Sequence, residues 1–470
     1  MKLLKSLLRT FKKFKVFLIL CFSILLFSCG GGGGNTPAPS PNLQTSNLSF
    51  SWEVVSPESQ GLSAAKVNAA MNFAMNDGQY SQAVLIIKNG KIVGENYKGI
   101  GATEKANLVN SSASLNENNV QTYFGIRDTN SMVTSWSVAK SVTSMIFGIA
   151  QGKGFFSNGL NVSASNFLTE WANDSRNSIT IKNLLDMRSG LEPACYDAGT
   201  SSWSVCNLIT INGGGSVGQA PNQLSGCIAS NKAATGQTHS WYRSGSANYE
   251  AGYFSYQNCD TMILGEVFYR AVGQDIKSFA DTHLFSKLNI SADWWRDNST
   301  NGQANGNYLS YCCIDMTARD FAKLALLLMN NGLWEGEQII PSSYVQAIKN
   351  ITTTSVVTET GSLMSYGLKF WSLYPSSVCG ELNNELCVQA NTIITPIGFD
   401  GQYMLMDFTN NLIMIRFSLY YELAQVSNDK KMVFAFPGNS NYILTAPLVI
   451  SSLSLAQNFI PAKFWYELNN

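Results

Sequence analysis

Two residues in the first third of the chain have the types and spacing of an activated nucleophile. Ser137 and Lys140 are three positions apart in the stretch Thr-Ser-Trp-Ser-Val-Ala-Lys-Ser. On a helix, this spacing places the hydroxyl and the amine on the same face. The amine would then be close enough to take the hydroxyl proton, and buried surroundings would lower the pKa of the lysine. The pair predicts a serine that is activated by a lysine.

The same spacing at Ser63 and Lys66 shows that spacing alone does not identify a nucleophile. Ser63 stands at the N-cap position of an ordinary surface helix that ends at Gly78, so we interpret it as structural. Ser137 instead has small and apolar neighbours. The apolar residues that follow it at helical spacing are Val142, Met145, Ile146 and Ile149. This pattern predicts a helix inserted into the core, with its first turn facing a cleft.

A second candidate for chemistry is Tyr256, which has Asn258 two residues after it. A phenol beside a lysine can move a proton between a nucleophile and a leaving group, and an amide can orient a substrate carbonyl. Taken alone, Tyr256 is more typical of a core or rim aromatic residue than of a catalytic one.

The elements that must position these groups are strands at both ends of the chain and helices in the middle. Residues 83–87 and 92–97 flank an Asn-Gly pair, which predicts a hairpin. Thr317 opens an apolar helix that Gly332 closes. The Gly-, Ser- and Asn-rich segment 195–236 predicts a surface or lid segment. The expected C-terminal elements are strands at 366–373, 392–395, 398–406 and 412–419, followed by a helix at 446–459.

The motifs occur in the order of the serine β-lactamase and penicillin-binding-protein superfamily, and the chain resembles its class C side. They are the Ser-x-x-Lys motif at 137–140, the Tyr-x-Asn motif at 256–258 and a glycine-bearing strand at Gly401. The fuller match adds Leu-Leu-Asp-Met-Arg-Ser-Gly at 184–190 and Gly-x-x-Gly-Gln at 398–402. It is similar to the 6-aminohexanoate-dimer hydrolase and esterase branch.

The resemblance runs from about residue 53 to the end and implies a β-lactamase-like α/β (α+β) fold. In that fold, an antiparallel sheet flanked by the terminal helices packs on a mostly helical lobe, with the site between them. The order of strands and helices expected from the sequence agrees with it.

The resemblance also implies roles for individual residues. Ser137 would be the nucleophile, and Lys140 and Tyr256 would share the acid and base work. Asn258 would orient the substrate, and the backbone N–H groups of Ser137 and Gln402 would form the oxyanion hole. The implied reaction is hydrolysis of an ester or amide through an acyl-enzyme, without a cofactor or a metal ion.

The expected substrate-binding residues are Asn258, Tyr196, Asp400, Gly401 and Gln402. Tyr196 would be a second tyrosine that contacts substrate. Where β-lactamases carry Lys-Thr-Gly, this chain has Phe-Asp-Gly at 399–401. An ionised Asp400 about 5 Å from a substrate carboxylate would repel it by roughly 3 kcal/mol at an effective dielectric near 20. We therefore expect neutral or cationic esters and amides to be preferred over β-lactams, unless Asp400 points away or is neutralised by a nearby Arg or Lys.

The N-terminal segment has the pattern of an export signal. Six basic residues precede an apolar run at 16–27, which predicts a signal peptide at 1–28. Leu-Phe-Ser-Cys at 26–29 resembles the lipobox of bacterial lipoproteins, so we expect Cys29 to be lipidated and 29–47 to be a flexible tether to a domain at 48–470. We expect the protein to be a lipoprotein of the bacterial cell envelope that faces the periplasm, and we favour the outer membrane. The alternative is a plain signal peptide cut near Ser28.

The charge composition gives no reason to expect a nucleic-acid partner. The chain has 31 basic and 31 acidic residues. Removal of the signal takes away six basic and no acidic residues, which leaves 25 against 31, a net charge of about −6. The expected partners are a small ester, amide or peptide-like substrate and, through the lipid anchor, a membrane. The oligomeric state is left open.

Eight cysteines remain after Cys21 and Cys29 are set aside, which is enough to pair fully in an oxidising compartment. Short separations suggest that Cys379 pairs with Cys387 and Cys195 with Cys206. We expect the adjacent pair at 312–313 to take different partners. A zinc site is disfavoured because the chain has no C-x-x-C pair and only two histidines.

Two other functions are kept as alternatives. The first is a β-lactamase or a D-Ala-D-Ala carboxypeptidase. The second is a sensor that binds penicillin or peptidoglycan without turnover. The presence of the hydroxyl, the amine and the phenol together argues for an enzyme.

Overall fold

The computed structural model describes residues 50–111, 115–206, 216–233, 238–239, 247–248, 254–300, 303, 306–351, 355–357, 363–373, 393–419 and 461–469. The expected signal peptide (1–28), the tether (29–47), the expected helix at 446–459, and Cys379 with Cys387 lie outside these residues. None of the helices in the described ranges has the length and apolar character needed to cross a membrane.

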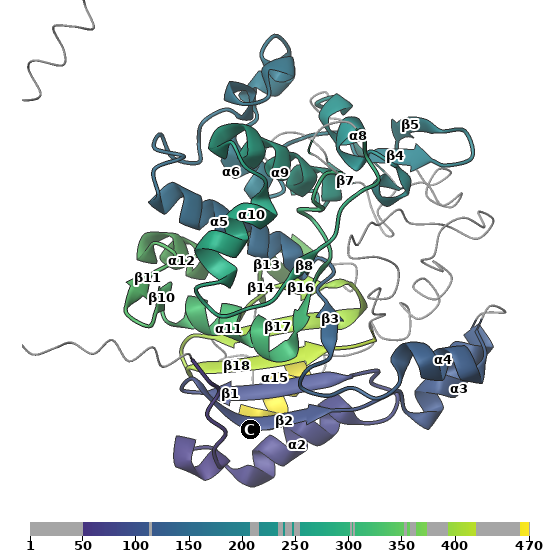
Figure 1. The fold of residues 1–470 in the computed structure, drawn as a ribbon, viewed down its shortest axis with the longest axis vertical. Coiled ribbons are helices and arrows are strands. Elements are labelled where there is room, and N and C mark those ends of the chain that lie inside the picture. Colours follow the sequence, from purple (N-terminus) through teal and green to yellow (C-terminus); the bar gives the residue numbers. More distant parts are fainter. Residues whose placement is uncertain are drawn as a thin grey trace, which may run out of the picture. The chain divides into compact units, whose positions relative to one another are not determined.

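One antiparallel sheet runs through the middle of the described residues (Figure 1). The β1–β18 ladder, from Ala83↔Phe417 to Lys88↔Leu412, joins the N-terminal hairpin to the C-terminal strands. The strand order is β12 (Ser355–Val357), β13 (Leu363–Gly367), β14 (Phe370–Leu373), β15 (Ile393–Thr395), β17 (Gln402–Asp407), β18 (Leu412–Phe417), β1 (Ala83–Lys88) and β2 (Lys91–Tyr97), with β16 (Ile397–Gly398) paired to β17.

The N-terminal hairpin confirms the Asn-Gly prediction. Asn89 and Gly90 have φ angles of 53° and 78°, and they connect β1 to β2 with Lys88 opposite Lys91. Both angles lie in the left-handed region, which asparagine tolerates and glycine adopts freely, so this dipeptide matches the right-handed twist of the strands.

The two faces of the sheet are covered by different helices, because side chains alternate along each strand. Val84 and Ile86 of β1 pack in a cluster with α2 (Ala64–Met75) and α15 (Pro461–Asn469). Leu85 and Ile87 face the larger cluster that contains α5 (Val138–Gly152), α9 (Asn258–Val272) and α11 (Ala318–Met329). Complete burial of each such side chain contributes about 1.5–3 kcal/mol. The predicted arrangement of terminal helices, sheet and helical lobe is therefore confirmed.

The helical lobe is built around α5. All residues of α5 from Val138 to Ala150 are buried, as expected for a helix inserted into the core. The α11 helix begins as predicted, because the Thr317 Oγ1 accepts the Asp320 N–H at 3.1 Å. The remaining helices are α3 (Ala102–Ser111), α4 (Glu117–Phe124), α6 (Ile181–Leu185), α8 (Gln223–Ala229), α10 (Ile276–Ala280) and α12 (Ser342–Lys349).

Short strand pairs connect these helices. They are β3 (Met132–Thr134) with β9 (Ile314–Thr317) and β8 (Asp293–Trp294), β4 (Ala194–Asp197) with β5 (Ser202–Val205), β6 (Thr238–His239) with β7 (Ala247–Asn248), and β10 (Leu333–Trp334) with β11 (Glu337–Gln338).

The strand expected at 366–373 is in fact a hairpin of β13 and β14. The chain turns at Leu368 and Lys369, whose φ angles are 48° and 64°. The prediction of one strand was wrong because neither turn residue is a glycine, asparagine or proline, the usual signs of a turn. The helix at Ser63 is positioned as predicted, but it ends at Met75 rather than at Gly78.

The disulfides agree with one prediction and overturn another. Cys195 is bonded to Cys206, as expected. The prediction for the adjacent cysteines was wrong, because Cys312 and Cys313 are bonded to each other. The third bond, Cys227–Cys259, joins α8 to the first turn of α9. These three bonds include every cysteine in the described ranges.

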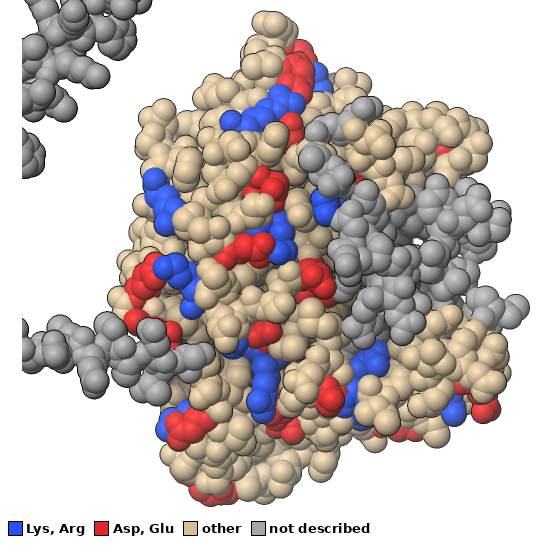
Figure 2. All heavy atoms as spheres, in the orientation of Figure 1, with Lys and Arg blue, Asp and Glu red and all other residues tan. Residues whose placement is uncertain are grey.

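Charged side chains are sparse on the face shown in Figure 2, where blue and red residues are interspersed among a majority of uncharged ones. This is the pattern expected from a charged fraction of 13%.

Candidate active site

Ser137 stands at the start of α5, directly after a strained turn. Trp136 has a φ angle of 45°, a conformation that costs a bulky residue about 1–3 kcal/mol and is concentrated at functional sites. The turn is fixed by its neighbour Ser135, whose N–H donates to the Ile314 carbonyl at 2.9 Å and whose Oγ accepts the Ile314 N–H at 2.8 Å. The β3–β9 pairing therefore sets the position from which Ser137 enters the helix.

The amine of Lys140 lies beside the Ser137 hydroxyl. Lys140 Nζ is 2.8 Å from Ser137 Oγ, 2.9 Å from Asn258 Oδ1 and 3.0 Å from the Tyr311 carbonyl oxygen. The lysine is 1% exposed. Residues from α5, α9 and the segment before β9 thus meet at one nitrogen atom.

Burial holds the pKa of Lys140 well below its usual range, and the positive charge of Lys369 lowers it further. A neutral amine has two N–H donors and one lone pair. The two donors match the Asn258 and Tyr311 oxygens, and the lone pair is then free to accept the Ser137 hydroxyl proton. The arrangement suits a general base.

The ring of Tyr256 lies next to the same amine. Lys140 Nζ is 5.0 Å from the centroid of the Tyr256 ring. The ring packs against Trp371 and Tyr366, with centroid separations of 5.5 Å and 5.9 Å. A backbone hydrogen bond fixes the segment that carries Tyr256, because the Ser255 N–H donates to the Met187 carbonyl at 2.9 Å. The structure therefore brings together Ser137, Lys140, Tyr256 and Asn258.

The strand expected to carry the oxyanion hole packs directly against the turn at Ser135 and Trp136, called the nucleophile turn below because it precedes the candidate nucleophile Ser137. A methyl group placed on Gly398 would lie 2.5 Å from the Ser135 carbonyl oxygen, so only glycine permits this approach. After the 3₁₀ turn at Phe399–Gly401, Gln402 begins β17. Its buried side chain accepts the Ser418 N–H at 2.9 Å, which fixes the residue whose own N–H is the expected oxyanion donor.

A buried arginine holds the turn before Gln402. Arg416 Nη1 donates to the Gly401 carbonyl at 2.6 Å, and its other nitrogen atoms donate to Ser81 Oγ and the Gln79 carbonyl. Arg416 lies on β18 and is 0% exposed. The guanidinium thus ties the oxyanion strand to the segment that leads into β1.

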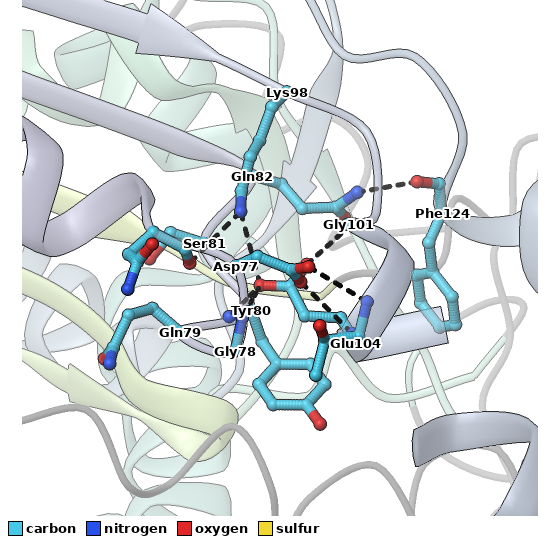
Figure 3. Close-up of polar contacts among 12 residues, drawn as sticks. Asp77, Gly78, Gln79, Tyr80, Ser81, Gln82, Lys98, Gly101, Glu104 and Phe124 are labelled. Atoms are coloured by element: carbon cyan, nitrogen blue, oxygen red, sulfur yellow. Dashed lines mark hydrogen bonds and ion pairs between the residues drawn. The ribbon is translucent and has the colours of Figure 1, made fainter. Parts of the chain in front are cut away.

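Figure 3 shows how that segment is itself fixed by the buried carboxylate of Glu104. Glu104 accepts the N–H groups of Gly78, Tyr80 and Gly101 at 3.1, 2.6 and 2.8 Å, and it pairs with Lys98 at 3.3 Å. A carboxylate that accepts several backbone N–H groups makes a rigid connection. Glu104 thus fixes the backbone on both sides of Gln79, whose carbonyl accepts a hydrogen bond from Arg416. In this way it supports Arg416 and the strand that begins at Gln402.

An aromatic pair lies where the 3₁₀ turn meets the turn before Ser137. The ring of Phe399 meets the ring of Trp136 edge to face at a centroid distance of 5.8 Å, and Phe399 is 41% exposed. Trp136, which precedes Ser137, and Phe399 of the 3₁₀ turn therefore present apolar surface beside Ser137.

The remaining expected residues are placed elsewhere or lie outside the description. Tyr196 lies on β4, where its ring meets Trp203 at 5.1 Å, and no described contact joins it to Ser137. Asp400 is in the 3₁₀ turn, but its side chain is outside the described atoms. His283 packs on Phe279 at 4.4 Å, without a described contact to the site. Among the described residues, no group of three or more His, Cys, Asp or Glu is placed to hold a metal ion.

Sequence reasoning missed three groups of the site. They are the Tyr311 carbonyl, the buried lysine Lys369 and the buried carboxylate Asp260. A backbone carbonyl leaves no sequence signal. Lys369 does leave one, because it is the only charged residue in the otherwise uncharged run at 363–373.

Comparisons with known proteins identify the family and the fold of the chain. The chain matches the Beta-lactamase family over residues 74–419. A protein of Bacillus anthracis assigned as a 6-aminohexanoate-dimer hydrolase has a similar structure, with 18% identity, a TM-score of 0.51, and coverage of 84% of this chain and 82% of that chain. A comparison with curated protein sequences found no match.

Two further solved structures are similar at lower scores. A penicillin-binding protein from Bacillus halodurans has 13% identity and a TM-score of 0.48, with 76% of this chain and 96% of that chain covered. A class C β-lactamase from Rhodobacter sphaeroides has 13% identity and a TM-score of 0.47, with 77% and 95% covered.

The family match extends over well more than half of the chain and includes Ser137, Lys140, Tyr256 and most of the sheet. The Bacillus anthracis structure shows the same fold. The resemblance drawn from the ordered motifs is thereby confirmed, and the chain belongs to the Beta-lactamase family, within the serine β-lactamase and penicillin-binding-protein superfamily.

Proposed function

We propose that this protein is a serine hydrolase that cleaves an ester or amide through an acyl-enzyme on Ser137. The observation that carries the proposal is the position of the buried Lys140 amine, 2.8 Å from Ser137 Oγ, with only uncharged oxygen atoms as its hydrogen-bond partners among the described residues. Burial lowers the pKa of a lysine held in this way, which favours the neutral amine that can act as a base.

The reaction would proceed in two halves. Ser137 Oγ attacks the substrate carbonyl carbon while its proton passes to Lys140 Nζ, and the oxyanion is held by the N–H groups of Ser137 and Gln402. The intermediate collapses as the leaving group takes a proton delivered through Lys140 and Tyr256, which leaves an ester on Ser137. Water then attacks this ester, gives its proton to the same groups, and releases the acid and the free serine.

Labelling with a fluorophosphonate tests the nucleophile. The probe bonds its phosphorus to Ser137 Oγ as fluoride leaves and the lysine takes the proton. We expect mass spectrometry to find the label on Ser137 of the full chain, and we expect hydrolysis of a short-chain aryl ester. Ser137→Ala should lose both, while Ser63→Ala should keep both, since Ser63 only precedes α2. An unlabelled wild-type protein would replace this proposal with the binding or sensor function.

The substrate class is proposed from the sequence of the oxyanion turn. A carboxylate at Asp400 would disfavour the carboxylate of penicillins and of D-alanine peptides, so we propose neutral or cationic esters and amides as substrates. The test compares an uncharged aryl ester with a penicillin in wild type and in Asp400→Asn. We expect the ester to be preferred, and the substitution to reduce the preference by about a hundredfold at most, which corresponds to roughly 3 kcal/mol. A wild-type preference for penicillin would favour the β-lactamase alternative.

The location is proposed from the N-terminal sequence. We propose that Cys29 carries a lipid that anchors the protein to a membrane facing the periplasm. Cys29→Ala should leave the protein unprocessed or release it into the soluble fraction. Unchanged mass and unchanged membrane fractionation of this variant would contradict the lipid anchor.

A further inference from the structure

A second lysine is buried behind the candidate active site. Lys369 is 1% exposed and lies in the turn between β13 and β14. Its carbonyl accepts the Ser141 hydroxyl at 2.6 Å, and Ser141 directly follows Lys140 on α5. Its N–H donates to the Leu185 carbonyl at 3.0 Å. The turn is therefore fastened to the helix that carries the proposed base.

The backbone around this lysine is strained. Leu368, Lys369 and the nearby Met187 have φ angles of 48°, 64° and 56°. Each such conformation costs a residue with a side chain about 1–3 kcal/mol, and two-residue hairpin turns of this kind normally use Asn-Gly. Glycine would adopt the positive φ angle of residue 369 at a lower free-energy cost than lysine does. The presence of a lysine therefore points to a role for its side chain.

The buried carboxylates of this region act on Lys369 and not on Lys140. Asp260 is fully buried, and one of its oxygen atoms has no hydrogen-bond partner among the described residues. Asp186 accepts a backbone N–H of the Lys369 turn at 2.9 Å. Burial lowers the pKa of Lys369 to about 7, and the negative charges of Asp260 and Asp186 oppose a larger fall, so Lys369 holds its proton below neutral pH. Lys140 contacts no carboxylate in the described part of the chain.

The amine of Lys369 has one described hydrogen bond, to the Met187 sulfur at 3.2 Å, which is a weak acceptor. The charges of Lys369 and Asp260 attract each other within the buried interior, although no described contact joins the two side chains. Burial raises the pKa of Asp260, and the charge of Lys369 opposes that rise.

Two buried lysines that interact electrostatically cannot both hold a proton without a large cost, because each charge raises the free energy of the other. We propose that Lys369 is a positioning residue that holds a buried positive charge behind the site, in one cluster with the Asp260 carboxylate, and so leaves Lys140 uncharged to accept the Ser137 proton. The inference rests on the acyl-enzyme function proposed above and extends it to a residue that touches neither the substrate nor the reacting atoms.

The other titratable groups around the two amines do not replace Lys369 in this role. Burial raises the pKa of Tyr311 and of Tyr366, so both phenols stay neutral. The ring faces of Tyr256 and Tyr311 near Lys140 Nζ favour an ammonium ion, and so oppose the effect of Lys369. The Arg188 guanidinium lies over the Phe254 ring.

The test measures the rate at which a fluorophosphonate labels Ser137 from pH 5 to pH 10, with the full chain. In wild type the rate should rise with pH as Lys140 loses its proton. Lys369→Met removes the neighbouring charge, which raises the pKa of Lys140, so the rise should move to higher pH by about one unit. Labelling should fall about tenfold on the acidic side and reach the wild-type plateau at high pH.

Two further variants separate this electrostatic role from a structural one. Lys369→Met with Asp260→Asn leaves no unpaired buried charge, so it avoids the instability that the single variant risks, and it should show the same direction of shift. Lys323→Met removes another buried lysine, which pairs with Asp320 on α11 at 2.8 Å, and should leave the pH profile in place.

A fall in rate that is equal at all pH values, or no change, would overturn the role of Lys369 while Ser137 labelling in wild type still upheld the hydrolase. A shift in Lys323→Met would overturn it as well. If wild-type Ser137 takes no label, the hydrolase itself is wrong and the role of Lys369 falls with it.

Discussion

The protonation of Lys140 depends on the kind of atom at each of its hydrogen bonds. Its amine meets a hydroxyl, an amide oxygen and a backbone carbonyl, all without net charge. A carboxylate at any of these places would favour the ammonium and remove the base. The amide of Asn258 is therefore well suited to this position, since it orients the amine without adding a charge.

Asn258→Asp should convert the base into an ion pair. The new carboxylate, 2.9 Å from the amine if the geometry is kept, should raise the pKa of Lys140 by about 1–3 units. Because a raised pKa keeps the lysine protonated at neutral pH, activity at pH 7 should fall at least about tenfold and return only at higher pH. The measurement is the pH dependence of kcat/KM for an uncharged aryl ester.

Asn258→Ala is the matched control, because it removes the same hydrogen bond without adding charge. It should lower activity with no upward movement of the acidic limb. An Asp variant whose acidic limb coincides with that of wild type would show that Lys140 is not the titrating base.

At this scale, spacing predicted the pair that shares one helix, and the order of the motifs predicted Tyr256 and Asn258, but nothing predicted Lys369. The positions of Ser137 and Lys140 follow from helical periodicity, which is local. Lys369 lies 229 residues after Lys140 in the chain, and its carbonyl meets Ser141, the next residue on α5, only because the hairpin turns toward that helix. No pattern in a single sequence reports such an approach.

Among the elements, the contact between the nucleophile turn and β16 sets the distance between the serine and the oxyanion strand. The strand and the turn are far apart in the sequence. They approach closely because Gly398 has no side chain. Gly398 also lies opposite Gln402 in the β16–β17 pair. Any widening here would move the Gln402 N–H away from the position proposed for the oxyanion.

Gly398→Ala should therefore reduce kcat by about 10–100-fold, since a misplacement of about 1 Å in a catalytic group has effects of this size. The added methyl group would otherwise lie 2.5 Å from the Ser135 carbonyl oxygen and 2.8 Å from Gln402 Cβ. KM and the melting temperature should change much less. Gly199→Ala, in the exposed turn after β4, is the control and should leave kcat unchanged. A normal kcat in Gly398→Ala would contradict this spacing role.

The elements were predictable where the local signal was strong. The Asn-Gly hairpin and the Thr317 cap form as predicted, because both signals act within four residues. The β13–β14 hairpin could not be predicted, since its turn residues are leucine and lysine and its strands read as one apolar run. Tertiary contacts, including the bond from Ser141 to the turn carbonyl, hold this turn where local preference does not.

For the whole molecule, the Cys227–Cys259 disulfide connects stability with the site, because Cys259 directly follows Asn258. Cys227→Ser with Cys259→Ser opens a link of 32 residues, which should lower the free energy of unfolding by about 4 kcal/mol on loop entropy alone. It should also reduce activity, because the start of α9 loses its tether to α8. Denaturant unfolding and ester hydrolysis measure the two effects.

The Cys195–Cys206 disulfide supplies the control. Cys195→Ser with Cys206→Ser opens a link of 11 residues on the β4–β5 hairpin, and should cost about 3 kcal/mol. Since no described contact joins this hairpin to Ser137, the remaining folded protein should keep its activity. Equal activity losses in the two double variants would contradict a specific link between the α9 disulfide and the site.

The β1–β18 ladder has a consequence for how the protein is made. It pairs residues 83–88 with residues 412–417, so the centre of the sheet cannot close until almost the whole chain has left the ribosome. Closing a loop of this length carries an entropy cost before any contact repays it, which makes folding slow. During that interval β1 and β17 have open hydrogen-bonding edges, and a chain cut before residue 412 would keep them permanently. Truncated products of this protein should therefore aggregate instead of forming a smaller active domain.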